Sequence, residues 1–98
     1  MEVYVKLKQM DQNVVLAICD VEILGKTLCE GKTTFKVKEE FYNGGKVNVD
    51  EAINMIENAN IINLVGKCCV EKAIQKKYIH PDAILIIEGI PHAQIMKL

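Results

Sequence analysis

The chain has 98 residues, half of them hydrophobic, and a net charge of −1. This length provides one hydrophobic core, so one domain over residues 1–98 is expected, and the near-neutral charge excludes a global field that would attract nucleic acid or an anionic membrane. All twelve basic residues are lysines and serine is absent, which excludes arginine clamps and Ser-His-Asp catalysis within the chain.

The first third of the chain is typical of strands. Residues 2–10 alternate apolar and polar side chains, and an apolar run, 14–19, follows a turn, so these two segments predict a hairpin. Residues 20–25 predict one helical turn or a wide loop that stops at Gly25. Residues 32–38 alternate again and predict a third strand.

Two helices are predicted after the break at Gly44-Gly45. Asn48 is placed to cap the first helix, with Glu51 three residues later as in a capping box. Residues 60–65 resemble a strand, and residues 66–78 predict the second helix. The expected buried stripe of the first helix is Ala52, Ile53, Ile56 and Ala59, and that of the second is Cys69, Val70, Ala73 and Ile74.

The chain closes with two predicted strands, 83–87 and 92–96, joined as a hairpin. The expected element order is therefore β-β-β-α-β-α-β-β. This order predicts a small α+β domain with a mixed sheet and two helices that cover at least one of its faces.

The four cysteines lack the spacing of a zinc knuckle or a redox pair. We expect them to be reduced thiols, with no metal and no cofactor. The N-terminal segment alternates charged and apolar residues and resembles neither a signal peptide nor a membrane anchor. A cytoplasmic protein that does not associate with membranes is the resulting expectation.

Several short segments are distinctive in combination and in their order along the chain. They are Cys19-Asp20, Leu24-Gly25-Lys26, Phe41-Tyr42, Asn63-Leu64-Val65-Gly66 and Pro91-His92-Ala93-Gln94. Together, from Val3 to Met96, they resemble an archaeal family of small proteins, the domain-of-unknown-function 424 family. The resemblance implies an archaeal cytosolic protein of this size and supplies no activity; an association with RNA or translation is the expectation that goes with it.

One candidate anion site lies where a predicted strand enters the second helix through Gly66. A glycine at this point lets backbone N–H groups and the positive helix end approach an anion, and Lys67 adds a charge. Asn63 would then be a ligand-binding amide. The alternative is structural, with Asn63 as the helix cap and Gly66 permitting close packing. The sequence is neither a P-loop nor a dinucleotide fingerprint.

Asp20, at the end of the second strand, allows the same two interpretations. With Gly25 and Lys26 it forms a second wall of a ligand pocket, or it caps a single helical turn that Gly25 ends.

The last strand places an imidazole and an amide on one face, at His92 and Gln94. Buried polar side chains require hydrogen-bond partners, so this pair belongs to a structural network, a binding surface or an acid–base site. Pro91 is expected to start the strand, because it cannot donate to the ladder.

Lysines flank an aromatic residue along two of the predicted strands. Tyr4, Lys6 and Lys8 share one face of the first strand, and Thr34, Lys36 and Lys38 share one face of the third. If the two strands share a sheet face, their lysines suit a phosphate backbone and Tyr4 suits a stacked base. The alternative is a solvated face whose lysines block edge pairing.

Three hypotheses follow, and we expect a binding module rather than an enzyme. The first is binding of RNA or a ribonucleoprotein through the lysine face. The second is an anion-binding, small-molecule or enzymatic pocket. The third is a partner or homodimer interface at an exposed last strand. The pocket would require convergence of Asp20, Gly25, Lys26, Asn63, Gly66, Lys67, His92 and Gln94.

Overall fold

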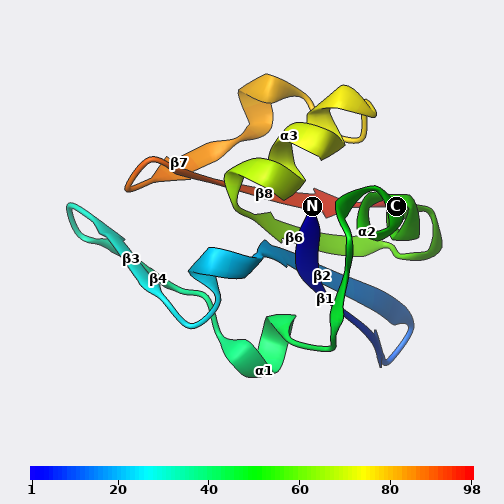
Figure 1. Cartoon of the computed structure of the whole chain (residues 1–98). Coiled ribbons are helices and arrows are strands. Elements are labelled where there is room, and N and C mark those ends of the chain that lie inside the picture. The colour runs from blue at the N-terminus through cyan, green and yellow to red at the C-terminus, as the bar shows by residue number, and fades with distance from the viewer.

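A computed structural model describes all 98 residues, and its centre is a six-stranded mixed sheet (Figure 1). Strands β2 and β6 run parallel at the middle of the sheet, and all other neighbours are antiparallel. This confirms the α+β class with a mixed sheet. In spatial order the strands are β5 (Lys46–Asn48), β1 (Glu2–Met10), β2 (Asn13–Asp20), β6 (Ile61–Val65), β8 (Ile90–Met96) and β7 (Leu85–Ile87).

Two helices, α2 (Val49–Asn54) and α3 (Lys67–Gln75), cover one face of the sheet, which we call the helix face (Figure 1). Alternate strand residues such as Leu16, Ile18 and Ile62 meet them in a cluster of sixteen buried residues. The predicted stripes lie in this core; Ile74 is only partly buried. A 3₁₀ turn extends α2. Asn48 caps the start of this helix as expected, since its Oδ1 accepts from the Asp50 N–H at 2.9 Å.

The opposite face of the sheet, the hairpin face, carries a separate two-stranded hairpin and a short helix. The hairpin pairs β3 (Thr27–Glu30) with β4 (Thr33–Lys36), and α1 (Glu39–Tyr42) follows. The expectation that 32–38 joins the main sheet is therefore wrong. The alternation of residues 32–38 correctly predicts a strand with one buried side. Its pairing partner is β3, and the four residues of β3 are too few to show the alternation that would have identified a strand there. The core on this face holds eight buried residues.

The last two strands form the expected hairpin, closed by a two-residue turn at Glu88 and Gly89. Both residues have positive φ, 51° and 74°, as the type I′ turn requires. Strand β8 lies inside the sheet, between β6 and β7. The expectation that the last strand is exposed as an interface is therefore wrong, because β7 takes the edge position.

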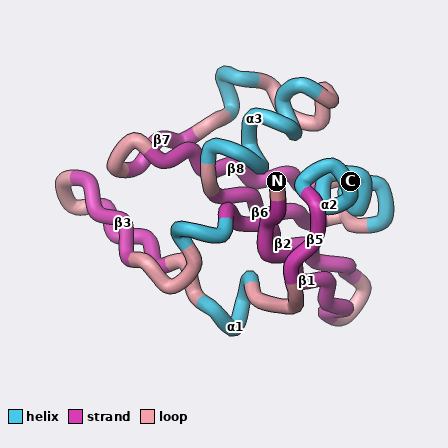
Figure 2. Tube along the Cα trace, viewed as in Figure 1, coloured by secondary structure: helices cyan, strands magenta, loops and turns pink.

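The tips of the two hairpins lie side by side (Figure 2). The Cys29 N–H donates to Glu88 Oε1 at 2.5 Å, and the Glu88 N–H donates to Glu30 Oε1 at 3.0 Å. These contacts hold the β3–β4 hairpin over one end of the sheet and leave the rest of the hairpin face to α1 and solvent. No helix of the protein is long and apolar enough to cross a membrane.

Candidate functional site

The strand register gathers most of the predicted polar residues on the hairpin face. Because directly paired residues share a face, a row across four strands places their side chains together. One row contains Lys6, Ala17, Asn63 and Gln94, and the next contains Tyr4, Cys19, Val65 and His92. The face is identified by Cys19 and Val65, which belong to the hairpin-side core. Residues predicted for two different sites therefore lie on one surface.

A cavity of about 250 Å³ lies between the hairpin segment, α1 and the sheet. It combines three aromatic rings, two ammonium groups, one amide and one imidazole, and no carboxylate lines it. Its lining residues are Phe35, Lys36, Lys38, Phe41, Tyr42, Asn63 and His92.

His92 is the least satisfied polar residue of the protein. Its Nε2 is buried and has no hydrogen-bond partner. The ring packs on Phe35, with centroids 4.6 Å apart and planes tilted by 36°. Burial lowers the pKa of the imidazole below its ordinary value, which favours the neutral ring. A buried polar atom without a partner marks a place where a ligand or a water completes the site.

Asn63 lines the same cavity, is partly exposed and has no side-chain hydrogen bond to the protein. It does not cap α3, so that structural interpretation of Asn63 is wrong. The reason is the pleat, which points residue 63 to the hairpin face while α3 covers the helix face. Its amide therefore keeps both donor and acceptor capacity for a ligand.

The N-terminus of α3 is occupied by a carboxylate of the protein itself. Asp20 accepts the Cys68 N–H at 2.8 Å and the Cys69 N–H at 3.0 Å, and it is 3% exposed. Burial raises the pKa of Asp20, and the two N–H donors oppose that rise. Gly66 is required here: its φ is +121°, and a Cβ would overlap the Asp20 carboxylate. The predicted anion site is thus filled internally.

The predicted convergence of the two glycine segments with Asn63 and His92 in one pocket does not occur. Asp20, Gly66 and Lys67 lie on the helix face, away from the cavity on the hairpin face. Asp20 makes no cap bond to the 3₁₀ turn that follows it, so that alternative is also wrong. Gly25 ends this turn with a φ of +84°, and exposed Lys26 leads into β3; neither residue lines the cavity.

Comparison with known proteins places the chain in a family. A family model described as "Protein of unknown function (DUF424)" matches residues 8–98. The chain belongs to the DUF424 family. A solved structure, "Crystal structure of an uncharacterized conserved protein from Methanopyrus kandleri", is similar to it with a TM-score of 0.81 and 26% identity, covering 100% of this chain and 95% of that one. No curated protein matches the chain.

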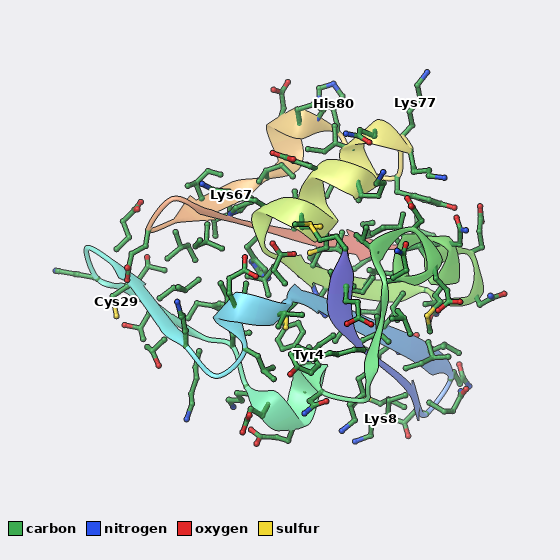
Figure 3. All side chains as sticks on the ribbon, viewed as in Figure 1. Tyr4, Lys8, Cys29, Lys67, Lys77 and His80 are labelled. Carbon is green, nitrogen blue, oxygen red and sulfur yellow. The ribbon has the colours of Figure 1, made fainter.

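Tyr4 and Lys6 of β1 are placed differently from the expectation for this DUF424 chain. Lys6 Nζ donates to the Glu40 carbonyl of α1 at 2.6 Å, and Lys46 Nζ lies 5.4 Å from the centroid of the Tyr4 ring. Tyr4 is therefore a partly buried ring with a lysine over it, and not an open stacking platform. Figure 3 shows Tyr4 and Lys8 on the α1 side of the sheet, with Lys67 on the α3 side.

The expected continuous lysine face does not form, because β4 lies outside the main sheet. Instead, Lys36 and Lys38 line the cavity together with two rings that are not among the predicted site residues, Phe35 and Phe41. The indication available in the sequence is proximity, because each ring stands three residues from Lys38. Without the position of the hairpin, nothing in the sequence joined them to Asn63 and His92.

Proposed function

We propose that this DUF424 protein binds single-stranded RNA on the hairpin face, with one base in the cavity and phosphates at Lys36 and Lys38. The observation that supports this most is the composition of the cavity: rings, unpaired lysines and free hydrogen-bonding groups in one concave site. Each of these groups matches one part of an unpaired nucleotide.

Stacking is supplied by Phe35 and Phe41. Phe41 is 38% exposed although it belongs to a short helix packed on the sheet, and Phe35 is partly exposed beside His92. Base–aromatic stacking contributes roughly 1–3 kcal/mol per base and tolerates any base. An exposed ring at the cavity is thus a favourable platform for a base that is not already paired.

Charge is supplied locally, since the protein as a whole has a net charge of −1. The lysine–carboxylate ion pair of the structure is Lys72–Asp50, so Lys36 and Lys38 are free of carboxylate partners. Exposed Lys8 and the neighbouring Lys6 extend positive charge along β1 on the same face. Four phosphate contacts predict a slope of about −3 in log affinity against log salt for a single strand.

The size of the cavity favours a base on a longer chain. A volume of about 250 Å³ lies below the roughly 300–1,000 Å³ typical of sites for complete drug-sized ligands. A base that remains stacked in a duplex is not available to such a cavity, whereas the bases of loops and single strands are.

The test is fluorescence anisotropy of a labelled, mixed-sequence RNA oligomer at about 50 and 250 mM salt, over which affinity should fall roughly 100-fold. Lys36→Glu combined with Lys38→Glu should abolish binding. The matched control, Lys67→Glu with Lys76→Glu, makes the same charge change at exposed positions on the helix side and should bind at least half as well as the unmodified protein.

Two further ligands sharpen the result. A duplex of the same sequence should bind weakly, and the DNA version separates RNA from single-stranded nucleic acid in general through the 2′-hydroxyl. Absence of binding at low salt, or equal loss in both double variants, would contradict the proposal.

A further inference from the structure

The geometry points to adenine as the base that the cavity selects, with Asn63 reading its N6 and N7 edge. This inference rests on the proposed binding of single-stranded RNA and adds a specificity to it. It starts from two uncharged hydrogen-bonding side chains that the main sheet places at the cavity without a protein partner, Asn63 and His92.

The sheet fixes the spacing of these two side chains. Asn63 on β6 is directly opposite Gln94 on β8, and Val65 is directly opposite His92. Asn63 and His92 are therefore diagonal neighbours on one face, a relation that separates residues by roughly 7–8 Å. Such a pair approaches two different points on the rim of one heterocycle, and a two-ring purine spans it better than a single-ring pyrimidine.

The chemistry of Asn63 distinguishes between the purines. An asparagine amide binds adenine bidentately, since its oxygen accepts from the N6 amino group while its N–H donates to N7. Guanine presents acceptors at both O6 and N7, so one of the two contacts would place the amide oxygen against a carbonyl oxygen. The Asn63 amide makes no bond to the protein and is able to offer both contacts.

His92 provides the second point of contact. Its ring packs on Phe35 and its unpaired Nε2 is buried, so a neutral imidazole with the proton on Nε2 donates to a purine ring nitrogen only when the ring turns toward the cavity. A base that forms this bond removes an unsatisfied buried group from the protein, whereas a base that cannot form it leaves the cost in place.

The lysines define the competing outcome. Lysine binds guanine at O6 and N7, so Lys36 or Lys38 turned into the cavity would select guanine instead. Placing both lysines on phosphates, as the proposed function does, leaves base selection to Asn63 and His92. Preference between adenine and guanine thus reports which groups read the base.

The experiment varies one base in an otherwise abasic RNA oligomer and measures affinity by anisotropy. Adenine should bind about tenfold tighter than uracil, cytosine or guanine. Replacing adenine with 7-deazaadenine removes the N7 acceptor and should lose most of this preference. In the Asn63→Ala variant, exchanging adenine for 7-deazaadenine should not change the affinity. The Asn63→Asp variant should disfavour adenine, because a carboxylate then faces N7.

The 7-deaza comparison uses the unmodified protein, so it stays decisive even where a variant folds poorly. Equal affinity for all four bases with loss of binding in the Lys36→Glu, Lys38→Glu protein would overturn the adenine assignment and leave the proposed function standing. A guanine preference would also overturn it. Failure to bind any oligomer would remove the proposed function itself.

Discussion

The two faces of the sheet treat buried polar groups in opposite ways. On the helix face, Asp20 is buried and its carboxylate is satisfied by two N–H groups at the start of α3. On the hairpin face, His92 has a buried nitrogen without a partner, and Asn63 beside it is free. The larger core, sixteen buried residues against eight, also lies on the helix face. This contrast associates the helix face with stability of the fold and the hairpin face with the proposed site.

Asp20→Ala should have the largest effect on stability, a loss of about 3 kcal/mol. It leaves the Cys68 and Cys69 N–H groups without their acceptor at the N-terminus of α3, and each unsatisfied buried group costs about 1–3 kcal/mol. Urea denaturation followed by circular dichroism measures the loss. Asp20→Asn keeps one acceptor oxygen and should lose less. A loss below about 1 kcal/mol for Asp20→Ala would contradict the structural role of this carboxylate.

Phe41→Ala should weaken RNA binding and have little effect on stability. Its ring is partly exposed at the cavity, and the loss of one stacking contact should weaken RNA binding by about tenfold or more. The control is Ile86→Ala, which removes an exposed apolar side chain from the opposite face of the edge strand β7. Anisotropy titrations of both variants decide the point, and equal weakening in both would argue against a stacking role.

The pH dependence of stability should show a smaller effect, which comes from His92 on the hairpin face. The pKa of His92 is lowered in the folded protein because of burial, so the unfolded chain binds the proton more tightly. The contribution of His92 is therefore complete above its ordinary pKa of 6.5 and is lost as pH falls below it. Thermal melts between about pH 7.5 and 5 should show a smaller acid-side decrease for His92→Phe. An unchanged decrease in the variant would show that the acid-side loss of stability does not come from His92.

Thiol labelling perturbs the protein least, and the four cysteines should react in a clear order. Burial raises the pKa of Cys19 to about 12 and raises the pKa values of Cys68 and Cys69, whereas Cys29 is exposed on the hairpin. Because the thiolate is the reactive form, Cys29 should react first, Cys68 slowly, and Cys19 and Cys69 only on unfolding. Mass spectrometry of a timed iodoacetamide reaction gives the order. Early labelling of Cys69 would show that the helix face opens readily.

The sequence predicts the parts of the fold that repeat a pattern over several residues. Alternation identifies β1, and the Asn48 cap with its apolar stripe identifies α2. The missed elements β3, β5 and α1 contain four, three and four residues, too few to show a period. Their identity depends on partners elsewhere in the chain, as β5 pairs with β1.

Four of the residues that line the cavity are candidates from the sequence, whereas their arrangement is not predicted. Asn63, His92, Lys36 and Lys38 were each identified as candidates, because polar residues interrupt apolar runs there or alternate along a strand. Asp20 was assigned to the same pocket because the pairing that turns it toward α3 spans 48 residues and leaves no local trace. Phe41 was missed since an aromatic pair before two glycines is also typical of a turn.

The most direct test of this contrast is a ¹H–¹⁵N correlation spectrum of the labelled protein titrated with the RNA oligomer. We expect the shifted amides to map to the hairpin face, around Phe35, Lys38, Phe41, Asn63 and His92, while amides of α2 and α3 stay in place. Shifts concentrated at Lys67, Cys68 and the N-terminus of α3 would contradict the account, because they would make the helix face the binding surface.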